Sequence, residues 1–341
     1  MVSLKDIAEK TGLSKMTVSR ALQEGSSVSA ATRESVRACA RKLGYRPHLA
    51  ARSLRTGCSR TLCAVCGEPD ERGFARLAAF VETSRAAGYD VTVMFVSGGD
   101  SRAAARLADG IFAARAGGVA VFPDKTSLGE LVAALQAGGM PCVAADMDLS
   151  PADRPAGTTV EEGNRLTDRV SIDRQWGMQE AVRHLIAGGR RRIVYAGLDR
   201  ANSRGRYEGY CRGLDAFGLS PESIITRGHQ FADGRTAADR LLAMRARPDA
   251  VVTFDDPLAL GILNRFLELG VKVPEEVALV GFDDRPAAAM TYPELTTVSL
   301  PNRELGQAAA EILLRRIAGD SAPAGALSVT VKTQLVVRRS A

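Results

Sequence analysis

The sequence lacks any long hydrophobic run. No apolar stretch of the 341-residue chain approaches the roughly 20 residues that a helix needs to cross a bilayer. The first residues also lack the apolar segment of a signal peptide, because Asp6 stands where that segment would begin. These absences argue against membrane and secreted proteins. We therefore expect a cytoplasmic protein without a membrane partner.

The chain also has few of the motifs on which enzymes depend. It contains neither a Gly-x-Gly-x-x-Gly loop after its first predicted strand nor a Walker loop. Its three histidines, at positions 48, 184 and 229, are scattered and suggest neither a triad nor a metal cluster. Acid pairs at 255–256 and 283–284 could belong to a glycosidase, but sequence neighbours need not converge in space. We expect no enzyme activity, no catalytic residues and no cofactor.

Two of the six cysteines, Cys63 and Cys66, have the spacing of a redox or zinc pair. They fall in the run 61–66, which we interpret as a short buried strand. Residues i and i+3 of a strand point to opposite faces, which is poor geometry for a shared metal. We therefore favour small apolar side chains that fill a sheet, with a zinc or redox pair as the alternative, and expect no metal site.

Charge is unevenly distributed along the chain. Residues 1–60 carry twelve Lys/Arg and four acidic residues, a net charge of +8. The whole chain has 45 basic and 39 acidic residues, so residues 61–341 have a net charge of −2. This contrast predicts a small head that binds a polyanion and a larger body with a different function. A chain of this length is also too long for one core and indicates two or three domains.

The head has the pattern of three helices. Apolar residues at i, i+3 and i+4 from Leu4 predict a short helix that ends near residue 10, followed by a turn with Gly12. Ser14 is a natural N-cap for a second helix. A third helix is expected from about residue 30 to residue 43, capped by Ser29 at its start and by Gly44 after its end. Helix, glycine-containing turn and helix make a helix-turn-helix.

The second predicted helix has two different faces. At about 100° per residue, Val18, Ala21 and Leu22 cluster on an inner face. The outer arc combines long donors with short hydroxyls, the mixture that reaches base edges and phosphates in a major groove. A helical interaction module with a solvated basic face is the alternative, but the turn, the cap and the charge favour DNA binding. The outer arc consists of Lys15, Met16, Ser19 and Arg20.

A short segment follows the head. The pair Arg46-Pro47 breaks the third helix, and residues 48–56 predict a short helical segment that ends at Gly57. Isolated helices below roughly 12 residues are marginal in water, so something else must hold this one. A twin segment from a second subunit lying on DNA would suffice. An ordinary interdomain linker is the alternative.

Four motifs of this region closely resemble the head and hinge of LacI/GalR-family transcription regulators, and the resemblance continues through almost the whole chain. The motifs are Val2-Ser-Leu-Lys-Asp-Ile-Ala-Glu-Lys-Thr-Gly-Leu-Ser14, Thr17-Val-Ser-Arg-Ala-Leu22, Leu43-Gly-Tyr-Arg-Pro47 and Ala51-Arg-Ser-Leu54. The resemblance implies that Lys15, Met16 and Arg20 hold base-reading positions. It also implies that Leu54 is a hinge leucine that wedges into the minor groove. With these residues we assign Thr17, Ser19, Ser29 and Ala51 to the DNA-binding set.

From about residue 60, short β-rich runs alternate with amphipathic helical segments. Alternation at this spacing indicates doubly wound parallel sheets, and roughly 280 residues of it would make two lobes. The candidate strands are 61–66, 91–96, 118–122, 141–145, 192–197, 250–254 and 277–282, and the candidate helices are 74–88, 176–189, 204–217 and 257–270.

The predicted organisation is an all-α helix-turn-helix head at 1–47, a hinge helix at 48–58 and an α/β body at 59–341. The resemblance implies that the body is two-lobed and similar to periplasmic binding proteins, with an effector site and a dimer interface. We expect an N-lobe at about 59–165 plus 299–325 and a C-lobe at about 166–298 plus 326–341.

Polar side chains follow several strands at their carboxyl ends, where ligands bind in such folds. Asp146, Asp255 and Asp283 each follow a candidate strand, and Arg206 opens a helix after the fifth. Separated carboxylates and a guanidinium group suit a polyhydroxylated ligand. For each acid, a solvated loop carboxylate or a helix N-cap is the alternative.

The family resemblance assigns effector-binding positions within two motifs and adds two pocket residues. Asp283 belongs to Gly281-Phe-Asp-Asp-Arg-Pro286, and Arg206 belongs to Ser203-Arg-Gly-Arg-Tyr-Glu-Gly209. Phe74 matches a pocket aromatic, and Asp146 matches an acid on the opposite lobe.

The chain departs from the family pattern at two places. Asp255-Asp256 stands where the family usually has Asn-Asp, and Glu71-Arg-Gly-Phe74 replaces its Asn-Pro-Phe-Phe. An ionised aspartate only accepts hydrogen bonds. The first change therefore mildly favours a hydroxyl-rich or cationic ligand over an anionic one.

These observations predict a transcription regulator, a repressor by resemblance, that binds a pseudo-palindromic double-stranded operator as a homodimer. A small carbohydrate effector would change the closure of the lobes and so shift the DNA-competent population. Because no heptad repeat follows residues 335–341, we expect no tetramer helix. The protein would be bacterial and associated with the nucleoid when bound to DNA. A sugar-binding protein or carbohydrate-active enzyme without a DNA role would leave the +8 charge of residues 1–60 unexplained.

Overall fold

The structure is a computed structural model, and it divides the chain into two compact units, Met1–Ser59 and Arg60–Ala341. The predicted hinge, with Ala51 and Leu54, lies outside the described residues. The described residues are 2–22, 28–45, 59–67, 70–96, 101–122, 128–146, 167–319 and 325–341.

The head contains the three expected helices, α1 (Leu4–Thr11), α2 (Lys15–Ala21) and α3 (Ala30–Leu43). Each has a side-chain cap at its start. Ser3 and Asp6 form a reciprocal capping box at α1. One buried apolar side chain from each helix, Ile7, Val18 and Val36, meets in a small core.

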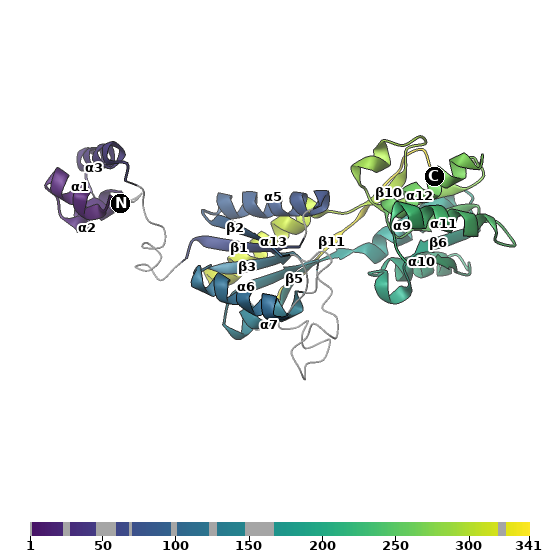
Figure 1. The fold of residues 1–341 in the computed structure, drawn as a ribbon, viewed down its shortest axis with the longest axis horizontal. Coiled ribbons are helices and arrows are strands. Elements are labelled where there is room, and N and C mark those ends of the chain that lie inside the picture. The colour runs from purple at the N-terminus through teal and green to yellow at the C-terminus, as the bar shows by residue number, and fades with distance from the viewer. Residues whose placement is uncertain are drawn as a thin grey trace. The chain divides into compact units, whose positions relative to one another are not determined.

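The first sheet of the body has six strands in the order β11-β5-β4-β3-β1-β2, and every neighbouring pair is parallel. Figure 1 shows α5 above this sheet and α6 and α7 below it, and α13 packs against α5. The strands are β1 (Thr61–Cys66), β2 (Asp90–Phe95), β3 (Gly118–Phe122), β4 (Cys142–Ala145), β5 (Asp168–Asp173) and β11 (Ser328–Lys332), and the helices are α5 (Glu71–Ala86), α6 (Ser101–Ala113), α7 (Gly129–Ala137) and α13 (Asn302–Ala318).

Alternating residues of β1 enter the two cores on either side of this sheet. Leu62 and Cys66 pack in the core that contains residues of α5 and α13, whereas Cys63 packs in the core of α6 and α7. The two thiols therefore lie on opposite faces, as strand geometry predicts. Burial raises the pKa of Cys63 to about 11 and that of Cys66 to about 12. Both thiols stay protonated and fill space like small apolar groups.

The second sheet has the order β12-β10-β9-β8-β6-β7 and is parallel except that β12 runs antiparallel to β10. Helix α9 packs on α10, and α11 packs on α12. The strands are β6 (Ile193–Gly197), β7 (Glu222–Ile225), β8 (Ala250–Thr253), β9 (Ala278–Asp283), β10 (Thr296–Ser299) and β12 (Gln334–Val336), the helices are α9 (Arg174–Ala187), α10 (Arg206–Asp215), α11 (Phe231–Leu242) and α12 (Asp256–Glu268), and the 3-10 turns are η2 (Arg200–Asn202) and η3 (Pro286–Ala289).

The boundary between the lobes differs from the predicted one. Strands β5 and β11 belong to the first sheet, whereas the predicted limits placed residues 166–298 and 326–341 in the second lobe. The two strands pair in parallel, with Arg169 opposite Ser328. A pairing between such distant segments leaves no local signal in the sequence, and the expected strands accordingly omitted both. The chain crosses between the sheets after β5, after β10 and after β11.

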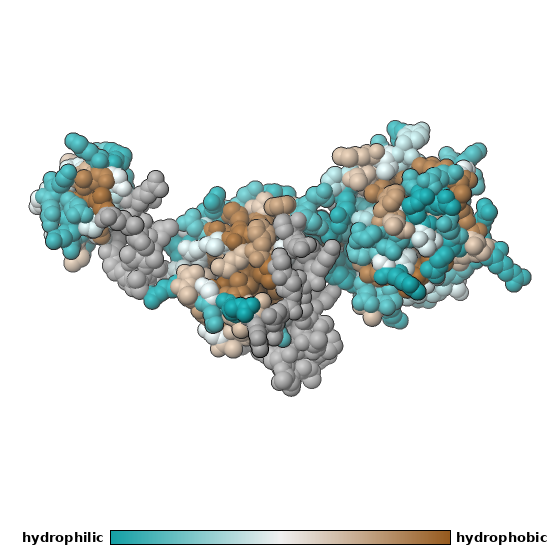
Figure 2. Space-filling view, in the orientation of Figure 1, coloured by the Kyte–Doolittle hydropathy of each residue, from teal (hydrophilic) through white to brown (hydrophobic). Residues whose placement is uncertain are grey.

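None of the helices in the described ranges is long and apolar enough to cross a membrane. Hydrophilic residues cover most of the visible face of the head, and hydrophobic residues gather on the visible face of the first lobe (Figure 2). This difference in surface character accompanies the difference in charge between the two units.

Candidate functional site

Helix α2 presents the residues that the sequence assigned to DNA reading. Lys15, Met16 and Arg20 are exposed, and Met16 has 66% of its surface accessible. Thr17 and Ser19 are half-buried. Val18 of the same helix is fully buried in the core of the head. The face of α2 that points away from the head core can therefore enter a groove.

Two of the predicted DNA-binding hydroxyl residues also take part in helix caps. The Oγ of Ser14 accepts a hydrogen bond from the Thr17 amide at 3.0 Å and lies 2.9 Å from the Thr17 hydroxyl. The Oγ of Ser29 accepts one from the Thr32 amide at 3.2 Å. Thr17 and Ser29 thus lie at helix N-termini, where the helix dipole and the first amides favour a phosphate.

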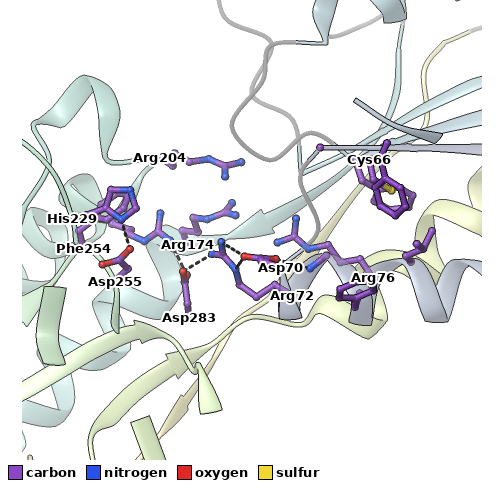
Figure 3. Close-up of a pocket in the computed structure, with 17 residues that line it drawn as sticks. Cys66, Asp70, Arg72, Arg76, Arg174, Arg204, His229, Phe254, Asp255 and Asp283 are labelled. Atoms are coloured by element: carbon purple, nitrogen blue, oxygen red, sulfur yellow. Dashed lines mark hydrogen bonds and ion pairs between the residues drawn. The ribbon is translucent and has the colours of Figure 1, made fainter. Parts of the chain in front are cut away.

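The body contains a cavity of about 160 Å³ between its two lobes. Residues of α5 and of the ends of β1, β2 and β3 line it from the first lobe. The ends of β8 and β9 and the start of α10 line it from the second lobe. The cavity therefore lies at the carboxyl ends of parallel strands, the usual position of ligands in doubly wound sheets. Figure 3 shows the side chains that surround it.

Arg206 and Asp283, the two residues of the family motifs, both line the cavity from the second lobe. Nη2 of Arg206 donates to Oδ1 of Asp283 at 2.9 Å, and both side chains are about 97% buried. The guanidinium group lies between the rings of Phe254 and Phe282, at 4.4 and 4.5 Å from their centroids. Burial lowers the pKa of Arg206 to about 10, and Asp283 opposes this change. Arg206 stays charged at neutral pH and holds Asp283 in place.

Arg72 joins the two lobes across the cavity. This residue lies in the first turn of α5, and its Nη1 donates to Oδ2 of Asp283 at 2.5 Å. Its Nε also donates to Oδ2 of Asp70, the N-cap of α5, at 2.8 Å. Asp283 therefore accepts hydrogen bonds from both lobes, as the dashed lines in Figure 3 show.

Asp146 lies behind the cavity wall, and the residues that line the cavity do not include it. This differs from the predicted direct role in effector binding. Its carboxylate contacts the guanidinium groups of Arg174 at 2.7 Å, Arg76 at 3.0 Å and Arg204 at 3.4 Å. Burial would raise the pKa of Asp146, but the three positive charges outweigh burial and hold the pKa well below its ordinary value. Asp146 is a buried anchor for arginines that do line the cavity.

Asp255 both lines the cavity and caps a helix. Its Oδ1 accepts a hydrogen bond from the Leu258 amide at 3.2 Å, and its Oδ2 lies 2.5 Å from Nδ1 of His229. The neighbouring Asp256 points elsewhere, and its oxygens accept from the Thr297 hydroxyl and the Arg285 amide. The side chains of the two adjacent acids therefore point in different directions.

Several of the residues around the cavity have unusual backbone conformations. Among the described residues other than glycine, five have a positive φ, and four of them are in this region. Left-handed backbone is uncommon for residues with a Cβ and is often found at functional sites. The four residues are Asp146, Arg204, Asp283 and Asp284, with φ of 61°, 51°, 102° and 52°.

Phenylalanine rings form the apolar part of the cavity. Phe74, the predicted pocket aromatic, lines it and has 56% of its surface accessible. Phe95, Phe122 and Phe254 line it as well. Such rings can cover the C–H faces of a ligand while the charged groups hold its polar atoms.

Sequence reasoning missed much of the basic wall. Arg72 stood in a noted departure from the family pattern but received no role. Arg174 and His229 follow β5 and β7, which were not among the candidate strands. The rule that ligand contacts follow strand ends would have found both residues if those strands had been recognised. The lining residues that were not predicted include Asp70, Arg72, Arg76, Arg174, Arg204 and His229.

A basic helix-turn-helix unit and a two-lobed body with a cavity between its lobes define a ligand-responsive DNA-binding protein. Comparisons with known proteins agree with this class. Residues 3–48 match the family of bacterial regulatory proteins called lacI, and residues 182–341 match the periplasmic binding protein-like domain.

Three similar proteins extend the match to nearly the whole chain. The HTH-type transcriptional repressor PurR of Vibrio atlanticus is 30% identical, over 93% of this chain and 92% of its own length. The ribose operon repressor of Escherichia coli is 28% identical, over 93% of both chains. The lac repressor dimer bound to operator and the anti-inducer ONPF superposes with a TM-score of 0.83, at 24% identity, over 99% of this chain and 98% of that one. The chain belongs to the LacI family of bacterial regulatory proteins.

Proposed function

We propose that this protein is a transcriptional repressor that binds an operator as a homodimer and changes its affinity for DNA when a small effector binds between its lobes. Helix α2 would read one major-groove half-site in each subunit. Lys15, Met16 and Arg20 would contact bases, and the N-termini of α2 and α3 would contact phosphates. The hinge residues Ala51 and Leu54 belong to this proposal by resemblance alone.

The effector part of the proposal rests on the position of Asp283 between the two lobes. Its carboxylate accepts hydrogen bonds from Arg72 of the first lobe and Arg206 of the second. A ligand hydroxyl that bonds to Asp283 would compete with or extend these contacts. Ligand binding would therefore change the interaction energy between the lobes, which is the requirement for shifting a conformational equilibrium.

The names of the relatives support this assignment. The relatives from Vibrio atlanticus and Escherichia coli are transcriptional repressors. We therefore propose that this chain also acts by binding DNA and does not catalyse a reaction. We place the protein in the cytoplasm, associated with the nucleoid while it is bound to DNA.

The proposal can be tested by selecting an operator from random double-stranded oligonucleotides with the purified full-length protein. Fluorescence anisotropy then measures affinity for the selected sequence and for a scrambled one, with and without small polyols and sugars. We expect a strong preference for a pseudo-palindrome and a change in affinity with one compound. If the protein binds all duplexes equally, the proposed function is wrong.

A further inference from the structure

The cavity wall is rich in guanidinium groups. Among the described residues, five arginines line the cavity against three aspartates, Asp70, Asp255 and Asp283. Asp146, a fourth acid, lies behind the wall and contacts three of these arginines. The five arginines are Arg72, Arg76, Arg174, Arg204 and Arg206.

The arginines approach the cavity from both lobes. Figure 3 shows Arg72 and Arg76 on the side of α5, with Arg174 and Arg204 on the side of the second lobe. Arg76, Arg174 and Arg204 all contact the single carboxylate of Asp146, within 3.0, 2.7 and 3.4 Å. Their guanidinium groups are therefore held close together and in fixed orientations. Such pre-orientation lowers the entropy that ligand binding costs.

Burial and neighbouring guanidinium groups lower the pKa of two of these arginines. Burial lowers the pKa of Arg76, and repulsion from Arg174, Arg72 and Arg204 lowers it further against the attraction of Asp146. Arg174 and Arg204 likewise add to the effect of burial on Arg206. Like charges thus crowd a poorly solvated space, where an anion would relieve the repulsion.

Asp255, the acid that favoured a cationic ligand in the sequence analysis, lies beside His229. Asp255 replaces the usual asparagine of the family, and from the sequence this change favoured a hydroxyl-rich or cationic ligand. In the structure, Oδ2 of Asp255 lies 2.5 Å from Nδ1 of His229. Asp255 and Asp283 can still accept hydrogen bonds from hydroxyl groups. The cluster of guanidinium groups in the rest of the described wall, however, favours an anion.

We infer that the effector is a small polyol that carries an anionic group, such as a sugar acid or a sugar phosphate. The carboxylate or phosphate would bind the guanidinium groups of Arg76, Arg174 and Arg204, whose planar donors match such oxygens. Asp283 and Asp255 would bind the hydroxyl groups, and the phenylalanine rings would cover the apolar face. This inference rests on the proposed function and narrows its ligand class.

The test compares compounds that differ in one group. Isothermal titration of the full-length protein would use D-glucose, D-gluconate, D-glucose 6-phosphate and D-glucosamine, and the same series built on D-ribose. Sodium sulfate and inorganic phosphate control for unspecific ion effects. In at least one series we expect the carboxylate or phosphate to bind about 10-fold to 100-fold more tightly than its neutral parent, as expected for charge-assisted hydrogen bonds. Comparison of the acid with the phosphate identifies which anion the site prefers.

Two variants locate the effect. Arg204→Gln removes one guanidinium group whose side chain is 32% exposed, so the fold should tolerate it. Arg303→Gln removes an exposed arginine that pairs with Glu82 on the surface and serves as the matched control. The preference for the anion should fall to a few-fold in the first variant and persist in the second.

The inference is wrong if the neutral or amine member of the series binds as tightly as the anion, or if Arg204→Gln keeps the full preference. In that case the proposed function still stands, provided that the bound compound alters operator affinity. The proposed function itself fails if a compound that binds in the cavity, whatever its charge, leaves operator affinity unchanged.

Discussion

Arg72 and Asp283 form an ion pair across the cavity, with 2.5 Å between Nη1 and Oδ2 and 211 residues between them in the sequence. Arg72 belongs to the first lobe and Asp283 to the second. The same carboxylate also accepts a hydrogen bond from Arg206. An interlobe contact and a ligand contact can therefore compete at the carboxylate of Asp283.

Replacing Asp283 by alanine should abolish the effector response, because the substitution removes both a ligand contact and the interlobe ion pair with Arg72. The head keeps all its residues, so the variant should still bind operator. The measurement is operator binding by anisotropy with and without effector. Asp284→Ala is the matched control, since the neighbouring acid contacts Arg338 instead. A normal response in Asp283→Ala would remove this residue from the effector site.

Arg20→Ala should cost about 1–3 kcal/mol of operator binding, concentrated at one or two base pairs, because an arginine that reads a base edge discriminates between bases. Affinities for a set of single-base operator variants would measure this. Arg41→Ala removes the same charge from α3, where Arg41 is exposed and pairs with Glu34. We expect that control to weaken all duplexes slightly and equally. If Arg20→Ala behaves in the same way, Arg20 contacts only phosphate.

Gly281→Ala should destabilise the body by about 1–3 kcal/mol, because overpacking a dense core forces its neighbours apart. A methyl group at this position would overlap Oδ1 of Asp256 and crowd Leu295. Denaturant unfolding followed by the fluorescence of Trp176, the single tryptophan of the chain, reports on the body. Gly110→Ala is the control, since nothing lies within 4 Å of its added methyl group. Equal midpoints for the two variants would contradict the predicted overlap.

Stability should fall as pH rises from about 4 to 7 because of Asp256. Burial raises the pKa of this carboxyl group to about 7 against the hydrogen bonds from Thr297 and Arg285, and the charges of Asp283 and Asp255 raise it further. The folded state therefore keeps a proton that the unfolded state loses near pH 4, so the stabilising effect present at low pH disappears by pH 7. At 1.36 kcal/mol per pKa unit, the loss is up to about 4 kcal/mol.

Asp256→Asn removes this titration. The free energy of unfolding, again from Trp176 fluorescence, should therefore fall less between pH 5 and pH 7 in the variant than in the unchanged protein. Other titrating groups cancel in the difference between the two curves. Parallel pH dependences would show that Asp256 does not titrate in this range.

Local patterns in the sequence were sufficient for the head and for much of the body. Ser14, Ser29 and Gly44 cap helices where expected, because caps depend on residues a few positions apart. Central strands such as β1 and β9 were predicted from continuous apolar runs. Strands β5 and β11 were not, because their pairing joins segments about 160 residues apart.

Local patterns in the sequence likewise predicted some residues of the candidate site but not others. Arg206 and Asp283 were predicted from strand ends and family motifs, and both line the cavity. Asp146 was predicted from a strand end as well, but its environment places it behind the wall. The basic wall was not predicted, because nothing local connects Arg76, Arg174 and Arg204.

The amino-acid sequence alone determined the charge of the head, the capped helices and the alternation of strands and helices, since these depend on residue type and on spacing of a few positions. The tertiary structure decided the chemistry of the cavity. Coulomb interactions follow distance in space, and only folding brings Arg76, Arg174 and Arg204 to within 3.4 Å of the Asp146 carboxylate. The described wall is rich in arginine for that reason, although residues 61–341 have a net charge of −2.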